Sequence, residues 1–135
     1  MEIQVTKVGV VSCSGEELPE GTLCRLACRK VLEERPGETV TICLPLFIAG
    51  GEEERAFAGK YPTITVDGCD KFCAAKATEK LSGKPSKTLL IPEILKKHGL
   101  TPPNKLRHFG PEEQAAVNAV AEDIARAVDE VLEEE

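Results

Sequence analysis

Cysteine is the residue type in this 135-residue chain whose chemistry is most specific, and there are six of them. Four follow segments rich in apolar or β-branched residues: Cys13 after Val8–Ser12, Cys43 at the end of Thr39–Cys43, and Cys69 and Cys73 after Thr63–Val66. Thiolates bind soft and borderline metal ions and attack electrophiles, whereas buried thiols behave as small hydrophobic groups. These four cysteines are therefore candidates for a metal site, for thiol chemistry or for core packing.

The elements that must position these cysteines alternate between strand and helix patterns. Strands are expected at residues 8–12, 39–43, 63–66 and 87–91, and helices at about 21–34, 52–58 and 69–81, before Gly99 and after Pro111. This alternation predicts an α/β fold with a small, mostly parallel four-stranded sheet flanked by helices, in a Rossmann-like three-layer arrangement that ends in a long C-terminal helix. Residues 1–135 are expected to form one domain.

Parallel strands bring their carboxyl ends to one edge of the sheet, where ligands bind in such folds. Cys13, Cys43 and Cys69 are expected at this edge, and Cys73 lies one helical turn beyond Cys69. One cysteine at a strand end is more often a core residue, but four at three successive strand ends favour a joint role. Their number matches a tetrahedral Cys₄ zinc site of a structural, storage or delivery type. The expected helix start at Cys69 would also lower its thiol pKa and favour the thiolate.

Cys24 and Cys28 are four residues apart on the expected first helix and share one of its faces. They are either accessory ligands, for a second metal ion or a cluster, or core residues beside Ala27 and Val31. The core interpretation is favoured.

Two other kinds of chemistry use the same cysteines. Cys13 or Cys69 could act as an activated nucleophile in thiol-redox or sulfur-transfer chemistry, or the set could hold an iron–sulfur cluster. The Cys-x₅-Arg loop of small cysteine phosphatases is excluded, because Pro19 stands at the arginine position. The sequence does not decide whether the protein is an enzyme.

The segment Asp67-Gly68-Cys69 with Cys73-Ala74, after Cys13-Ser14-Gly15 and Cys43, resembles the DGC-motif family of zinc-binding proteins. The family takes its name from the Asp-Gly-Cys tripeptide, and its members carry cysteines inferred to bind zinc. The resemblance extends from about Val8 to the last helix and implies Cys13, Cys43, Cys69 and Cys73 as the metal ligands. It implies no particular reaction. Cys24 and Cys28 depart from the family pattern.

Composition excludes several partners. A net charge of −6 with one Tyr and no Trp argues against nucleic-acid and membrane-surface binding. Met1–Lys7 carries no export signal, so we expect a cytoplasmic protein with reduced cysteines. The apolar Leu44–Ile48 loop is a lid over the metal, a protein-binding patch or an extension of the core. The C-terminal helix is expected to pack on the sheet, with a role in dimerisation as the alternative.

Expected roles or positions also follow for one acidic residue, Asp67, and for both histidines. Asp67 is expected to cap the helix that follows it rather than to act as a base. His98 and His108 are far from the cysteines in sequence, and we expect them at the surface and not among the metal ligands.

Overall fold

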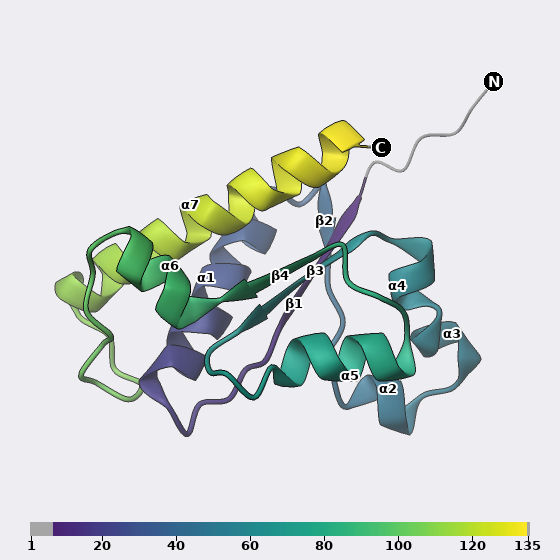
Figure 1. Cartoon of the computed structure of the whole chain (residues 1–135), viewed down its shortest axis with the longest axis horizontal. Coiled ribbons are helices and arrows are strands. Elements are labelled where there is room, and N and C mark those ends of the chain that lie inside the picture. The colour runs from purple at the N-terminus through teal and green to yellow at the C-terminus, as the bar shows by residue number, and fades with distance from the viewer. Residues whose placement is uncertain (1–6, 135) are drawn as a thin grey trace.

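The computed structural model describes residues 7–134, and its centre is a four-stranded, all-parallel sheet with the strand order β2-β1-β3-β4 (Figure 1). The strands are β1 (Val8–Ser12), β2 (Thr39–Val40), β3 (Thr63–Asp67) and β4 (Lys87–Leu90). The helices are α1 (Pro19–Glu34), α2 (Leu46–Ala49), α3 (Glu52–Arg55), α4 (Phe57–Lys60), α5 (Cys73–Leu81), α6 (Ile91–Lys97) and α7 (Pro111–Glu134). The predicted small α/β fold with a long C-terminal helix is confirmed.

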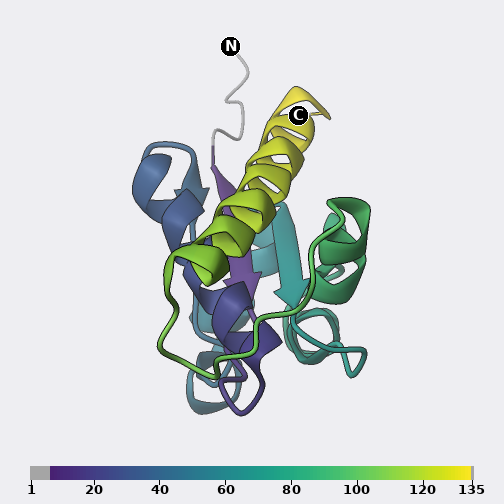
Figure 2. The same cartoon turned by 90° about the vertical axis from the view of Figure 1, so that its left-hand side faces the viewer.

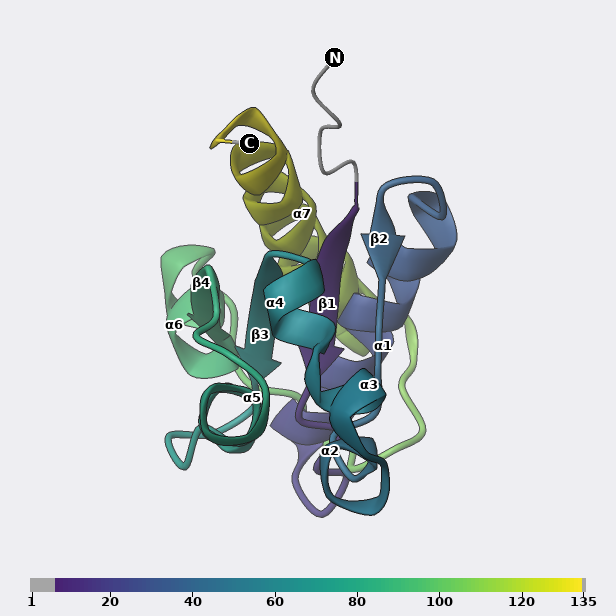
Figure 3. The ribbon, with the colours of Figure 1, turned by 90° about the vertical axis from the view of Figure 1, so that its right-hand side faces the viewer.

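Helices cover both faces of the sheet, which explains why its central strands β1 and β3 are buried over almost their whole length. Helices α1, α6 and α7 cover one face (Figure 2), and α2, α4 and α5 pack on the other (Figure 3). Val8, Val10 and Val11 of β1 are fully buried, as expected for a strand between two helical layers. Gly9 of the same strand is needed for close packing, because a Cβ there would lie 2.6 Å from the Phe57 ring.

Helix α7 packs mainly along α1, with further contacts to α6 and β1. Its apolar stripe joins the core on that face of the sheet through residues such as Val120 and Ile124. The expected packing on the sheet is therefore only part of its environment, because α1 lies beside it for much of its length (Figure 2).

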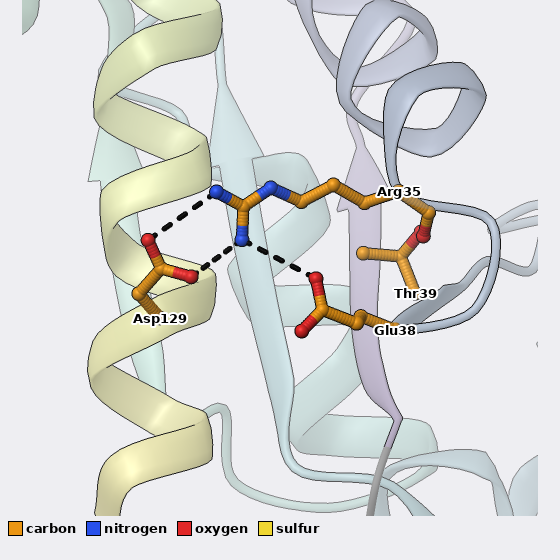
Figure 4. Close-up of polar contacts among 4 residues, drawn as sticks. All are labelled: Arg35, Glu38, Thr39 and Asp129. Atoms are coloured by element: carbon orange, nitrogen blue, oxygen red, sulfur yellow. Dashed lines mark hydrogen bonds and ion pairs between the residues drawn. The ribbon is translucent and has the colours of Figure 1, made fainter.

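A polar cluster ties the end of α1 to α7 (Figure 4). The guanidinium of Arg35 donates hydrogen bonds to both carboxylate oxygens of Asp129, one of them at 3.3 Å, and to Glu38 at 3.5 Å. The Thr39 hydroxyl donates to the Arg35 carbonyl at 2.7 Å, where β2 begins. This cluster fixes the turn between α1 and β2 against the C-terminal helix.

The second strand is shorter than predicted. Thr39–Cys43 was expected to be a strand, but β2 ends at Val40 and Cys43 lies in the following loop. The physical reason is the Thr41 hydroxyl, which donates to the Val10 carbonyl at 2.7 Å and so occupies an acceptor of the neighbouring strand. The expected acidic helix at 52–58 is likewise divided into α3 and α4.

The apolar segment Leu44–Ile48 was expected to be a loop, but it contains α2. Phe47 is fully buried against the sheet, whereas Ile48 is 72% exposed. The segment therefore has one core residue, Phe47, and two exposed large apolar residues, Leu46 and Ile48, rather than a single environment.

The helix expected to start at Cys69 begins at Cys73. Phe72 precedes it with a left-handed φ of 53°, which interrupts helical geometry between the two cysteines. Cys69 is therefore outside the helix, and its expected position in the first helical turn is wrong.

Within residues 7–134, no helix is both long enough and apolar enough to cross a membrane. The expected lack of an export signal rests on Met1–Lys7. Residues 1–6 of this segment lie outside the part of the chain that the structure describes.

Candidate metal centre

The candidate site lies where the strand order reverses. The chain leaves β1 for β2 on one side of the sheet, and β3 pairs with β1 on the other side, so a crevice opens beyond the carboxyl ends of β1 and β3. Cys13 follows β1 directly, and its backbone N–H donates to the Val66 carbonyl at 3.0 Å. The Gly68 N–H donates to the Cys13 sulfur at 3.3 Å. These two bonds hold the Cys13 thiol between the two strand ends.

Three of the predicted ligands border one hollow beside this crevice, which we call the first hollow. Its volume is about 40 Å³, and Cys13, Cys69 and Cys73 line it together with Asp67 and Gly68. Cys13 and Cys69 are half-buried, and Cys73 is exposed. The Asp-Gly-Cys-x₃-Cys segment therefore does bring its cysteines to the end of β1.

Cys43 borders a different hollow, which we call the second hollow. It has a volume of about 230 Å³ and is also lined by Cys13, Ser12 and Ser14. Cys43 itself is exposed. Cys13 lines both hollows. Cys43 therefore shares a hollow with Cys13 but not with Cys69 or Cys73.

Over the described part of the chain, no three His, Cys, Asp or Glu side chains already surround a point where a metal ion would bind. The donor chemistry nevertheless fits zinc, because several thiols line one hollow at a sheet edge. Cys43 and Cys73 are exposed, and Cys69 is in a turn outside α5. A closed coordination shell therefore requires movement of these side chains and of the loops that carry them.

Two glycines allow the loops around the site to pack closely. A Cβ on Gly21, in the first turn of α1, would overlap the carbonyl oxygen of Gly15. A Cβ on Gly68 would lie 2.9 Å from the backbone between Glu20 and Gly21. The start of α1 is therefore in backbone contact with both loops that carry the first hollow.

Asp67 caps the helix that follows the site. Its buried carboxylate accepts hydrogen bonds from the N–H groups of Ala74 at 2.7 Å and Ala75 at 3.1 Å, in the first turn of α5. Burial raises the pKa of Asp67, and these two N–H groups and Lys76 offset only part of that rise. The expected capping role is thus observed, although the helix starts four residues later than predicted.

The Cys13 thiol is held in its protonated form. The thiol of Cys24 beside it and burial raise the Cys13 pKa far above its usual range, while the backbone N–H groups of Gly15 and Gly68 act in the opposite direction. A metal ion that binds Cys13 must therefore displace its proton.

Cys24 and Cys28 are buried between α1 and the sheet, with exposed fractions of 0% and 3%. Cys24 is also a polar neighbour of the site, because its thiol donates to the Val66 carbonyl at 3.0 Å and lies 3.3 Å from the Ser12 hydroxyl. Sequence reasoning missed this contact. The contact could have been predicted from the order of the elements. Helix α1 follows the Cys13 loop directly, so the sheet-facing residues of its first turns lie near the end of β1.

Neither histidine lines the two hollows. The His98 ring is hydrogen-bonded to Asp123 of α7 at 2.9 Å and is only partly exposed, whereas a surface position was expected. Asp123 is buried, which on its own would raise its pKa, but His98, Lys97 and Arg126 together lower that pKa below its usual range. His108 is exposed, as predicted.

Comparison with known proteins identifies the family. The family model described as the DGC domain matches residues 9–131, a range that includes all six cysteines and nearly the whole fold. No curated protein and no solved structure shows significant similarity to the chain. The tripeptide Asp67-Gly68-Cys69 lies at the carboxyl end of β3, beside Cys13, within the matched range. The chain therefore belongs to the DGC domain family.

Proposed function

We propose that this protein binds one zinc ion through the thiolates of Cys13, Cys43, Cys69 and Cys73. The observation that carries the proposal is that Cys13, Cys69 and Cys73 line one hollow at the switch point of the sheet. Cys43 completes the set from the adjoining hollow, because Cys13 borders both.

A four-thiolate zinc site has no open coordination position and so does not activate water for hydrolysis. The proposed role is therefore structural, or storage and delivery of the ion. Exposure of Cys43 and Cys73 favours exchange of the ion with a partner over a permanently buried structural site. We infer a cytoplasmic location, because all six cysteines are free thiols and thiolate ligands require a reducing environment.

Elemental analysis of protein purified without added metal or chelator tests the proposal, together with a count of reactive thiols. We expect about one zinc per chain and fewer than six reactive thiols, because metal-bound thiolates react slowly. Iron with visible absorption in place of zinc would assign the same cysteines to an iron–sulfur cluster.

The double substitution Cys69→Ser/Cys73→Ser is expected to abolish zinc retention while the protein stays folded. The matched control is Cys28→Ala, which removes a buried thiol that lines neither hollow and should leave zinc at the wild-type level. Six reactive thiols in folded, metal-free protein, or a double variant that keeps its zinc, would refute the proposal.

A further inference from the structure

A row of three thiols leads from the carboxyl edge of the sheet into the core. Cys13 is half-buried and borders both hollows, so a small molecule can reach it. Cys24 and Cys28, on the face of α1 that packs on the sheet, are almost completely buried. An accessible thiol therefore adjoins thiols that solvent does not reach.

Two polar contacts fix Cys24 against the end of β1. The Val66 carbonyl accepts hydrogen bonds from both the Cys13 N–H and the Cys24 thiol, each at 3.0 Å. The hydroxyl of Ser12, the residue before Cys13, lies 3.3 Å from the same thiol. These contacts place the Cys24 sulfur at the end of β1, and Cys13, the next residue along the chain, packs against the core cluster that contains Cys24.

We propose that Cys13 and Cys24 are a reversible redox pair, in which Cys13 meets the oxidant and Cys24 resolves it by forming an intramolecular disulfide. Redox-active cysteines commonly combine an accessible thiol with a neighbouring resolving thiol. The difference in burial assigns the order of the two steps, because Cys24 is closed to solvent and, of these two thiols, a small oxidant reaches Cys13.

The oxidant class is a low-molecular-weight disulfide such as oxidised glutathione. The Cys13 thiolate attacks one of its sulfurs and expels one thiolate, which gives a mixed disulfide on Cys13. The Cys24 thiolate then attacks the Cys13 sulfur and expels the second small thiol. The protein loses two electrons and two protons, and the external disulfide gains both to become two thiols.

Peptide mapping distinguishes this pair from every other pair. Trypsin releases residues 8–25 as one peptide, because Arg25 is the first Lys or Arg after Lys7, and this peptide contains Cys13 and Cys24 but no other cysteine. Cys28 falls in the next peptide, residues 26–29. A Cys13–Cys24 disulfide therefore appears as one peptide that lacks two hydrogens and resists alkylation, whereas any bond to another cysteine joins two peptides.

The experiment incubates the full chain, stripped of metal by a chelator, with oxidised glutathione before alkylation, digestion and mass spectrometry. We expect the internal bond to appear in the 8–25 peptide, whereas the exposed thiols of Cys43 and Cys73 form mixed disulfides that add the mass of glutathione to other peptides. Addition of dithiothreitol should restore all six thiols. Because metal is absent, the outcome is independent of whether the protein binds zinc.

Two variants separate the roles of the buried thiols. Cys24→Ala is expected to stop at the mixed disulfide on Cys13, with about tenfold more bound glutathione than wild type. Cys28→Ala should form the internal bond as wild type does. Circular dichroism checks that each variant folds, and the wild-type map remains decisive if Cys24→Ala does not. A disulfide between Cys69 and Cys73, or persistence of six free thiols at excess oxidant, would overturn the proposal.

Discussion

The Gly68 N–H donates a hydrogen bond to the Cys13 sulfur at 3.3 Å, and this bond joins the ends of the two central strands. It brings the tripeptide at the end of β3 to the first cysteine of the chain, 55 positions earlier. Both residues depend on the parallel pairing of β1 with β3, in which Ser12 lies opposite Val66. The geometry of the site is therefore a property of the sheet.

Zinc affinity should rise with pH. The Cys13 pKa is raised, so at neutral pH zinc must displace a proton that an ordinary thiol holds less tightly. Competition titrations with a zinc chelator between about pH 6.5 and 8.5 should show affinity increasing by about tenfold or more per pH unit, since each thiol that deprotonates on binding adds a factor of about ten. A pH-independent affinity would show that no thiol loses a proton on binding.

Asp67→Ala should destabilise the metal-free protein by about 2 kcal/mol, because the N–H groups of Ala74 and Ala75 lose their acceptor in a buried site. Asp67→Asn should cost less, since an amide oxygen still accepts one bond and no charge is buried. Urea unfolding measures both free energies. Asp70→Ala is the control, because Asp70 is exposed and caps nothing.

The pH dependence of the same residue has a definite sign. Burial raises the Asp67 pKa in the folded state, so the folded protein binds this proton more tightly than the unfolded chain does. The stabilising contribution is complete below the unfolded pKa and is lost as pH rises through the raised one. The free energies of unfolding of wild type and Asp67→Asn, compared across pH 3 to 7, should isolate this decline. A wild-type free energy of unfolding that rises with pH relative to that of the variant would contradict it.

Gly21→Ala should unfold the protein or lower its stability by about 3 kcal/mol or more, because the added methyl overlaps the Gly15 carbonyl. Any folded fraction should also bind zinc poorly, since the Cys13–Gly15 loop must shift. Gly59→Ala is the matched control. Its methyl meets no atom within 4 Å in helix α4, so stability should stay the same or rise by up to about 1 kcal/mol.

The Arg35–Asp129 ion pair should contribute modestly to the free energy of unfolding. A double-mutant cycle with Arg35→Ala and Asp129→Ala is expected to give a coupling free energy of about 0.5–1 kcal/mol, because the contact is bidentate but largely exposed. The coupling should fall in 1 M salt. Arg35 lowers the Asp129 pKa, so the coupling is complete above the unfolded carboxyl pKa and is lost as pH falls through the lowered one. A coupling insensitive to both salt and acid would exclude an ion pair.

Sequence patterns were sufficient to predict a strand where its residue-type preferences and its tertiary contacts favour the same structure. The apolar run Val8–Ser12 is a strand for its whole length because helices cover both of its faces. Thr39–Cys43 has the same β-branched character, yet β2 ends at Val40 because the Thr41 side chain, and not its backbone, bonds to β1. A hydroxyl that competes with a strand ladder is a tertiary contact, and β propensity does not contain it.

The site was predictable as an edge of the sheet but not as a set of distances. Parallel topology brings Cys13, Cys69 and Cys73 together, which the order of strands and helices implies. The left-handed Phe72 decides where α5 starts, and no residue-type preference predicts a positive φ at a phenylalanine. The contacts of Cys24 depend on the rotation of α1 about its own axis. The sequence allows several starting residues for this helix, and each would give a different rotation.

The position of Cys13 at the border of both hollows and against Cys24 has a consequence for the whole molecule. A disulfide sulfur carries no thiolate charge and is a poor zinc ligand, so zinc coordination by Cys13 and its oxidation would exclude each other. If both proposals hold, a chain that carries zinc is protected from the Cys13–Cys24 cross-link, and a cross-linked chain has lost its first ligand. The ratio of thiols to disulfides around the protein would then determine how much metal it carries.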